Sequence, residues 1–507
     1  MSKWFICLMG WVMVFAVAGA PKVDAAGDGT VAIALTGEPA TMDPHRTSDI
    51  PGLMTWRWVY DTLLSAEMGT GKIRPWLATK WESKDNNKSV KFWLRKDAKF
   101  SDGSPVTSEA VKYSMSRVMK SDPQRPYFKS FDRIEVIDDT TFIWHNKAPD
   151  NGMLNLITLW AHVISLNARD KDEATLSRNS FGSGPYVLKS WTRGLKLVYE
   201  ANPLWWGDKM YPKRPKQVIL RGIPEGTTRV KALMAGEVDL AWAVMPQFIP
   251  QLEKDPNTRV ASVPGVRIMH MGFFASHGGP MANEKVRQAI NYAIDAELIR
   301  KTIMDGRAEL IGQMFIQSGR EPDKRWYDHD PGKAKALLAE AGYPNGFKMV
   351  ILSPVGRYLG DKATCEASAA MLGKVGVDAT CKAVNFPLYQ QLFRAHQSGK
   401  ETGAAAYYMG FGNPTGYPAF SLRGTTSCGG SWSAVCFKDL EDAIDKALEM
   451  ADLGDQQAAF DKVTDMMREK ATHKIFFRLH DITAYSSRLK YVPRNDERLY
   501  PWEIETE

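Results

Sequence analysis

One arginine offers clear binding chemistry in this sequence. Arg357 lies in the segment Ser353–Tyr358, which follows the apolar run Met349–Leu352 and precedes a predicted helix. The order strand, loop, helix places it at the carboxyl end of a strand. A guanidinium there can bind a carboxylate through two parallel hydrogen bonds. Arg357 is therefore either a ligand-binding cation or a solvated loop residue. Tyr358 either lines the wall of the same binding site or packs in the core.

A second segment is aromatic, and the sequence around it carries no acid. Tyr407–Pro414 contains Phe411, Gly412 and Asn413, and no Asp or Glu occurs from Thr402 to Lys438. An asparagine can accept a hydrogen bond from an ammonium group but cannot neutralise it.

A charged ligand buried in a cleft needs a partner for each of its charges, because an unpaired desolvated charge costs several kcal/mol. The acids Glu38, Asp43 and Asp49 follow the first predicted strand, Val31–Leu35. Either one of these acids meets an amino group of the ligand, or the ligand has no free amino group.

Enzyme signatures are incomplete in this chain. Gly69–Lys72 hints at a phosphate loop, but Ala66 and Ile73 break the pattern. The pair Gly410 and Gly412 lacks the third glycine of a dinucleotide loop, and neither H-E-x-x-H nor G-x-S-x-G occurs. The nine histidines are scattered. We expect a protein that is not an enzyme, with no cofactor and no metal site.

Composition points to an ordinary globular protein of two or three domains. The 507 residues are 44% hydrophobic and 24% charged, with a formal net charge of +7. Lys and Arg form no dense run, which argues against nucleic-acid binding.

The first 25 residues differ from the rest. Lys3 precedes an apolar run from Trp4 to Ala20, and Val23–Ala25 offers small residues before a cut at Ala26. This pattern predicts a cleaved secretory signal over residues 1–25 and a periplasmic protein, with a retained N-terminal anchor as the alternative. Cys7 lacks the small residues that a lipoprotein site places before its cysteine.

Export changes how the remaining cysteines are interpreted. Cys365, Cys381, Cys428 and Cys436 form an even set, so an oxidising compartment favours two disulfides. Proximity in the sequence predicts the pairs Cys365–Cys381 and Cys428–Cys436. Buried free thiols are the alternative, and zinc is disfavoured because no pair has C-x-x-C spacing.

The block from Trp76 to Ser114 combines several distinctive units. Ser89–Arg95 alternates apolar and polar residues as a strand with one buried face does, and Ser101–Pro105 is dense turn sequence. Thr107 then precedes a helix with an acid in its first turn. This block resembles the signature of the family 5 extracellular solute-binding proteins, which serve peptide-type ABC importers.

Other segments resemble phrases of the same family over nearly the whole mature chain. Asn202–Gly207 carries a distinctive tryptophan pattern, and Arg229–Ala241 reads as a helix stopped by a glycine and followed by a strand. Lys285–Asp295 is a predicted amphipathic helix, and Lys333–Phe347 is a predicted helix stopped by a glycine. A further helix is predicted over Trp56–Leu64. Helices alternate with short strands, which indicates an α/β fold.

The resemblance implies a two-lobed periplasmic binding protein of the Venus-flytrap type (type II, cluster C-like), with an extra subdomain in the first lobe. The chain would cross between the lobes near Gly265–Ser276 and near Phe476–Ala484. Lobe I would then comprise residues 26–264 with the inserted subdomain, lobe II residues 265–480, and residues 481–507 would return to lobe I.

The resemblance also implies roles for the candidate residues. In related dipeptide binders an arginine in the loop of Arg357 takes the ligand carboxylate. Tyr407–Pro414 resembles the family's strand ending in Gly-Trp and the loop after it, which implies that Phe411, Gly412 and Asn413 bind the ligand. Asn413 stands where an aspartate holds the ligand's amino terminus. Phe411 replaces a tryptophan, with a place in the core as the alternative.

The implied function is that of a monomeric exported receptor. It captures a small peptide or peptide-like solute and delivers it to the permease of an ABC importer. The alternatives are a non-peptide solute (an opine, a sugar or an anionic compound) and, from another class, a secreted peptidase or hydrolase.

Overall fold

The protein is described here from a computed structural model covering residues 29–47, 50–67, 72–121, 123–316, 326–450 and 453–506. The predicted signal segment 1–25 and Asp49 lie outside these residues. Within the described ranges, no helix is both long and apolar enough to cross a lipid bilayer.

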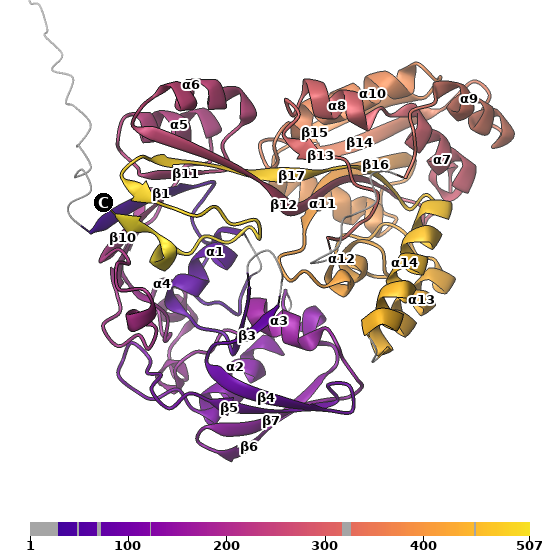
Figure 1. The fold of residues 1–507 in the computed structure, drawn as a ribbon. Helices are drawn as coiled ribbons and strands as arrows, with labels where there is room; N and C mark the ends of the chain where they lie inside the picture. The colour runs from indigo at the N-terminus through magenta and orange to yellow at the C-terminus, as the bar shows by residue number, and fades with distance from the viewer. Residues whose placement is uncertain are drawn as a thin grey trace, which may run out of the picture.

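A large mixed sheet runs through the whole molecule (Figure 1). Its strands, in spatial order, are β15 (Asp378–Val384), β14 (Lys348–Pro354), β16 (Ala404–Gly412), β12 (Thr258–Phe273), β17 (His473–Ser486), β11 (Leu240–Trp242), β1 (Thr30–Leu35), β10 (Gln217–Gly222), β9 (Lys196–Ala201) and β8 (Tyr186–Thr192), with β13 (Ala308–Glu309) also paired to β17. We call the part from β8 to β11 the first half and the part from β15 to β16 the second half.

The long antiparallel strands β12 and β17 join the two halves (Figure 1). Thr483–Tyr485 of β17 pairs with β11 in the first half, whereas Arg267–Phe273 of β12 pairs with β16 in the second. The register of the pair shifts between Pro264 and Ile268. The predicted boundary at 264/265 falls in this irregular stretch, and the lobe boundaries stay a prediction.

Each half has its own hydrophobic core. One cluster gathers around fully buried residues such as Trp58, Trp144 and Tyr199, and a separate cluster gathers around Ile290 and Phe393. Two smaller clusters gather around Val230 and Phe460. The two large clusters share no residue, as expected for two separately packed bodies that can move against each other.

The C-terminal segment packs in the first core. The indole of Trp58 donates a hydrogen bond to the carbonyl of Leu499 (2.7 Å), and Trp502 is buried in the same cluster. The short strands β18 (Leu489–Lys490) and β19 (Glu505–Thr506) pair with each other.

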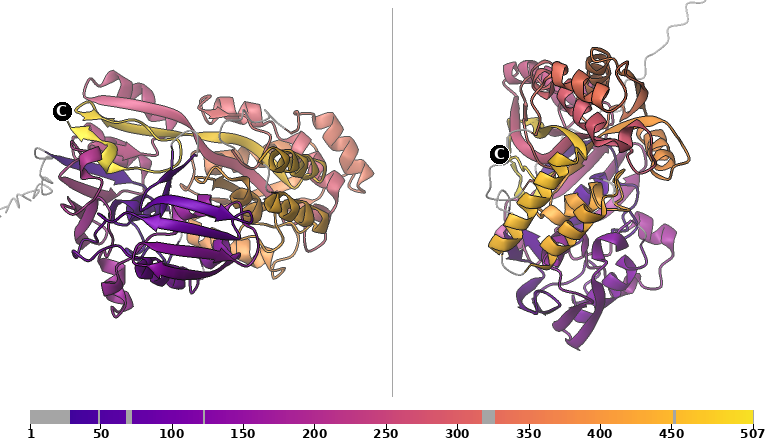
Figure 2. Two further views of the ribbon diagram at one scale, coloured as in Figure 1. Left: turned by 60° about the horizontal axis from the view of Figure 1, so that its bottom comes forward. Right: turned by 90° about the vertical axis from the view of Figure 1, so that its right-hand side faces the viewer.

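A second, smaller sheet lies on the far side of the molecule from α5 and α6 (Figure 2). Its order is β4 (Ala78–Lys84), β5 (Ser89–Leu94), β7 (Thr141–Asn146) and β6 (Phe131–Asp138), and helix α2 (Ser108–Val118) contacts it. The Thr107 hydroxyl accepts a hydrogen bond from the Ala110 N–H (3.3 Å) and caps α2. The predicted strand, cap and helix of the Trp76–Ser114 block are therefore confirmed.

The remaining elements cover the large sheet or connect it to the small one. The helices are α1 (Ile50–Val59), α3 (Met153–Trp160), α4 (Glu173–Arg178), α5 (Gly226–Met234), α6 (Ile249–Lys254), α7 (Glu284–Ala293), α8 (Ala296–Thr302), α9 (Pro331–Glu340), α10 (Asp361–Gly373), α11 (Phe386–Gln397), α12 (Pro418–Thr425), α13 (Lys438–Glu449) and α14 (Leu453–Glu469), and β2 (Leu64–Ala66) pairs with β3 (Ile73–Pro75).

The helix predicted over Trp56–Leu64 is wrong at both ends, because α1 begins at Ile50 and ends at Val59. The carbonyls of Asp61 and Leu63 accept hydrogen bonds from Val163 and Ala78, so this backbone serves neighbouring segments instead of a helix. Sequence periodicity cannot show that competition.

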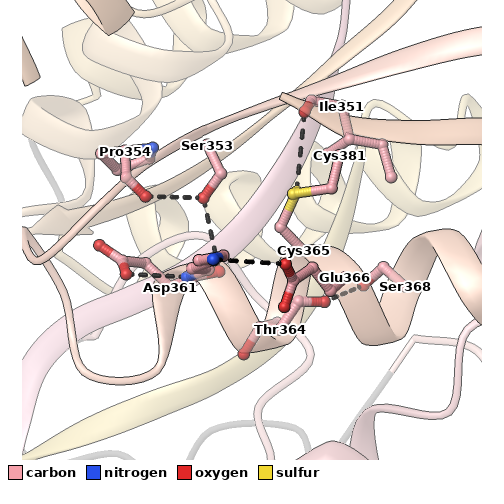
Figure 3. The surroundings of a disulfide bond; sticks show 10 residues. Ile351, Ser353, Pro354, Asp361, Thr364, Cys365, Glu366, Ser368 and Cys381 are labelled. Atoms are coloured by element: carbon pink, nitrogen blue, oxygen red, sulfur yellow. Dashed lines mark hydrogen bonds and ion pairs between the residues drawn. A yellow bond between two sulfur atoms is a disulfide. The ribbon is translucent and has the colours of Figure 1, made fainter. Parts of the chain in front are cut away.

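Both predicted disulfides are confirmed. Cys365 of α10 is bonded to Cys381 of β15, and Cys428 is bonded to Cys436. The first bond fastens α10 to the edge strand of the second half (Figure 3).

Candidate functional site

A pocket of about 240 Å³ lies where the two halves meet. Parallel strands of both halves end there: Thr36 follows β1, Ala243 follows β11, and Gly356 follows β14, and all three residues line the pocket. The carboxyl ends of parallel strands are the usual place for ligand sites in α/β proteins. The volume lies just below the range of about 300–1,000 Å³ typical of small-molecule sites, which indicates a small solute.

Arg357 lines this pocket and has a free guanidinium group. It stacks on the ring of Phe386, 4.4 Å from the ring centroid, and it forms no ion pair with any carboxylate in the described ranges. Its Nε is buried without a hydrogen-bond partner. A cation held in place by stacking and lacking an anion can bind the carboxylate of a ligand.

A buried carboxylate at the start of α10, Asp361, holds the loop of Arg357. Figure 3 shows the position of Asp361 on the helix. Asp361 is only 4% exposed and accepts four backbone N–H groups, from Gly356 (3.2 Å), Arg357 (2.9 Å), Tyr358 (3.1 Å) and Lys362 (2.8 Å). These bonds fix the backbone on both sides of the arginine. Asp361 therefore positions Arg357 without lining the pocket itself.

We expect Asp361→Asn to loosen this loop, because the amide NH₂ would face N–H donors. The free energy of unfolding should fall by about 1–3 kcal/mol, as for an unsatisfied buried group. Urea denaturation measures this. Glu366→Gln on the same helix is the control, since Glu366 is exposed and pairs only with Lys362 across 3.7 Å. Equal effects of the two changes would contradict the role of Asp361.

Tyr358 also lines the pocket and is 9% exposed. The guanidinium of Arg267 lies 5.5 Å from the centroid of its ring, and that of Arg357 lies at 5.8 Å. The ring therefore forms an apolar wall between two cations, and it also belongs to the core of the second half.

An arginine and two acids meet at the junction of the halves. Arg267 of β12 donates to the Gly410 carbonyl (2.7 Å) and to Oε2 of Glu497 (2.6 Å), and both side chains of this ion pair are largely buried. Asp481 of β17 lines the pocket beside them. Burial, and next the charge of Glu497, raise the pKa of the Asp481 carboxyl well above its usual range.

Gly412, a predicted ligand residue, makes room for this cluster. A Cβ at position 412 would lie 2.5 Å from Oε2 of Glu497 and 3.1 Å from Nη2 of Arg267. A side chain at position 412 would therefore displace the ends of this buried ion pair, and Gly412 itself does not line the pocket.

Arg229 forms part of the opposite wall, in the first half. Burial lowers the pKa of its guanidinium to about 10. Its N–H groups donate to the carbonyls of Ile223, Pro224, Trp242 and Ala243 at 2.7–3.0 Å. The arginine thus fastens the loop after β10 to the loop after β11 and adds positive charge to the pocket wall.

Glu225 lines the same wall and caps helix α5. Its carboxylate accepts the N–H groups of Thr227 (2.9 Å) and Thr228 (2.5 Å), and these bonds lower its pKa to about 2. Both oxygens are therefore already in use.

The structure does not bring Phe411 and Asn413 to the pocket. Phe411 packs against Phe420, with ring centroids 5.5 Å apart. Asn413 is 1% exposed; its Oδ1 accepts the hydroxyl of Thr415 (2.6 Å) and its Nδ2 donates to the carbonyl of Tyr417 (3.0 Å). The amide of Asn413 is used to build its own loop.

The two predicted acids in the described part of the first half are also engaged elsewhere. Glu38 accepts hydrogen bonds from the indole of Trp191 (2.6 Å) and the N–H of Gly194 (2.9 Å). Asp43 is 2% exposed and forms an ion pair with Arg117. Neither lines the pocket.

Sequence reasoning missed Arg267, Asp481 and Glu497. The first two are charges inside apolar strand sequence, and both fall within or next to the predicted crossings between lobes, which is a usable signal. Glu497 carries no such signal, because its position follows from the packing of the C-terminal segment.

Comparison with known proteins identifies the class. The chain is 25% identical over 448 residues to the dipeptide-binding protein of Escherichia coli K12, covering 82% of each chain. It is 26% identical over 463 residues to the glutathione-binding protein GsiB of Shigella flexneri serotype 5b, covering 87% of each.

The fold is also shared with solved structures. A dipeptide-binding protein from Pseudoalteromonas sp. SM9913, in complex with Met-Leu, superposes with a TM-score of 0.83 at 22% identity, covering 94% of this chain and 100% of the other. This likeness confirms the predicted two-lobed α/β fold, and we now call the two halves lobes.

The family comparison agrees. Residues 72–431 match the family described as bacterial extracellular solute-binding proteins, family 5, middle region. The relatives are periplasmic or extracellular binding proteins, and the family consists of receptors, not of enzymes. The predicted family is thus confirmed, and this chain belongs to the family 5 extracellular solute-binding proteins.

Proposed function

We propose that this protein is an exported receptor that captures a small peptide or peptide-like solute with a free carboxylate and delivers it to an ABC importer. The free guanidinium of Arg357 in the pocket between the lobes carries this proposal. A cation without an anion in a pocket favours an anionic group of the ligand.

Capture would work by a shift between open and closed forms. A ligand that touches both lobes stabilises the closed form by the difference of its affinities for the two forms. The pocket has walls from both lobes, including Trp242 and Met245 on one side and Tyr358 and Leu359 on the other. These side chains would exclude water around the ligand.

The cellular setting follows from the N-terminal sequence and the family. The signal pattern over residues 1–25 would direct the chain to the periplasm and be removed there. A monomeric receptor would then meet the permease subunits of the inner membrane transiently, with no cofactor and no nucleic acid involved.

Incubation with an equimolar mixture of dipeptides and tripeptides tests the proposal. Native mass spectrometry of the washed protein should show a retained peptide of unchanged mass, and the mixture should show no cleavage products. Retention of an opine, a sugar or another anion in place of every peptide would overturn the peptide assignment. New products in the mixture would indicate a hydrolase.

A further inference from the structure

The carboxyl group of Asp481 is incompletely paired. It lines the pocket from β17, and the backbone N–H of Glu497 donates a hydrogen bond to it. Its Oδ2 is buried and has no hydrogen-bond partner, and Asp481 forms no ion pair within the described chain. Buried polar atoms without partners are rare in native proteins and call for an explanation.

The neighbouring arginine is already engaged. Arg267 is ion-paired with Glu497 across 2.6 Å, and Asp481 has no ion pair of its own within the described chain, although the charge of Arg267 still favours its ionised form. A cationic group of a ligand would give Asp481 a direct partner, because opposite charges at short range attract strongly away from bulk water.

The other acids of the pocket already bind protein groups. Glu225 has both oxygens in the cap of α5, and Glu497 is held by Arg267. Asp481 is the remaining carboxylate among the described residues that line the pocket.

We propose that Asp481 binds the ammonium group of the ligand while Arg357 binds its carboxylate, so that the pocket selects zwitterionic solutes with a free amino end. This inference rests on the proposed function. It supplies the acid that the segment around Asn413 lacks, from a strand far along the chain.

The groups that face Asp481 determine which protonation state of its carboxyl is favoured with and without a ligand. Burial and the carboxylates of Glu497 and Asp496 raise the pKa of Asp481, whereas Arg267 lowers it, and Tyr491 lies near the same carboxyl. An arriving ammonium favours the ionised form, so binding should release a proton. As the pH is lowered, affinity for an amine should therefore begin to fall at a higher pH than it would if an ordinary carboxylate bound the amine.

Calorimetry with matched ligands tests the assignment. The probes are glycyl-glycine, alanyl-leucine and phenylalanyl-alanine, each beside its N-acetyl derivative. Acetylation should weaken binding to the unmodified protein by roughly 10- to 100-fold, as for loss of a hydrogen bond to a charged group. In Asp481→Asn, binding of the free peptides should be weakened by a similar factor, and acetylation should change affinity by about twofold or less.

Glu309→Gln is the charge control. Glu309 pairs with Arg478 across 2.8 Å and lies 3.9 Å from His480, yet it does not line the pocket. This variant should keep the full effect of acetylation. Thermal unfolding of Asp481→Asn should match the unmodified protein within a few degrees, since Asn is isosteric with Asp.

The outcomes separate the two proposals. If the unmodified protein binds none of the three dipeptides, the proposed function fails and this assignment fails with it. If the dipeptides bind but acetylation has the same effect in Asp481→Asn as in the unmodified protein, only the role of Asp481 is wrong.

Discussion

Arg357→Ala should weaken binding of a dipeptide by about 2–5 kcal/mol, the range for removing one partner of a desolvated charge pair. The alanine leaves the ligand carboxylate in the pocket without the guanidinium that stacks on Phe386. Isothermal titration calorimetry with alanyl-leucine measures the loss. Folding should be little affected, because no carboxylate in the described chain would lose an ion pair with Arg357.

Two comparisons make this result specific. The C-terminal amide of the same dipeptide should bind the unmodified protein weakly, and the change Arg357→Ala should reduce its affinity little further. Arg423→Ala is the matched arginine control, since Arg423 is about half exposed and lies 3.4 Å from Asp445. Unchanged affinity in Arg357→Ala would remove this arginine from the site.

Arg267→Leu should lower the free energy of unfolding by about 3–5 kcal/mol, because it leaves a buried carboxylate without its partner. Glu497 would lose its 2.6 Å ion pair and would repel the neighbouring Asp481. Urea denaturation at neutral pH measures the change. The loss should become smaller as the pH falls, because the raised pKa of Asp481 lets its carboxyl take up a proton, which removes the repulsion.

The double variant Arg267→Leu with Glu497→Leu is the matched control. It removes both members of the pair, so it should be clearly more stable than the single variant. A double variant as unstable as Arg267→Leu would show that packing of the arginine, and not its charge, supports the junction.

Local signals in the sequence were sufficient for much of the scaffold. The alternation in Ser89–Leu94 and the cap at Thr107 act within a few residues, and β5 and α2 form where they were predicted. The disulfides followed from proximity and export. Helix α1 was displaced because neighbouring segments take the backbone carbonyls of Asp61 and Leu63.

The pocket was predictable only where a strand end defines it. Arg357 was found because a loop after a strand reaches the cleft. Asn413 was interpreted from its position, yet its hydrogen bonds to Thr415 and Tyr417 occupy its amide. The positions of Asp481 and Glu497 at the pocket depend on the pairing of β12 with β17 and on the docking of the C-terminal segment. No local pattern encodes contacts between segments so far apart.

Strand β17 has a consequence for the order in which the receptor becomes competent. It lies between β12 and β11 in the large sheet (Figure 1). The chain after it carries Glu497, which lines the pocket. A chain synthesised only as far as residue 472 contains Arg357 but lacks the strand in the middle of its sheet, together with Asp481 and Glu497 of the pocket wall. The pocket can therefore be complete only once the C-terminal segment is in place.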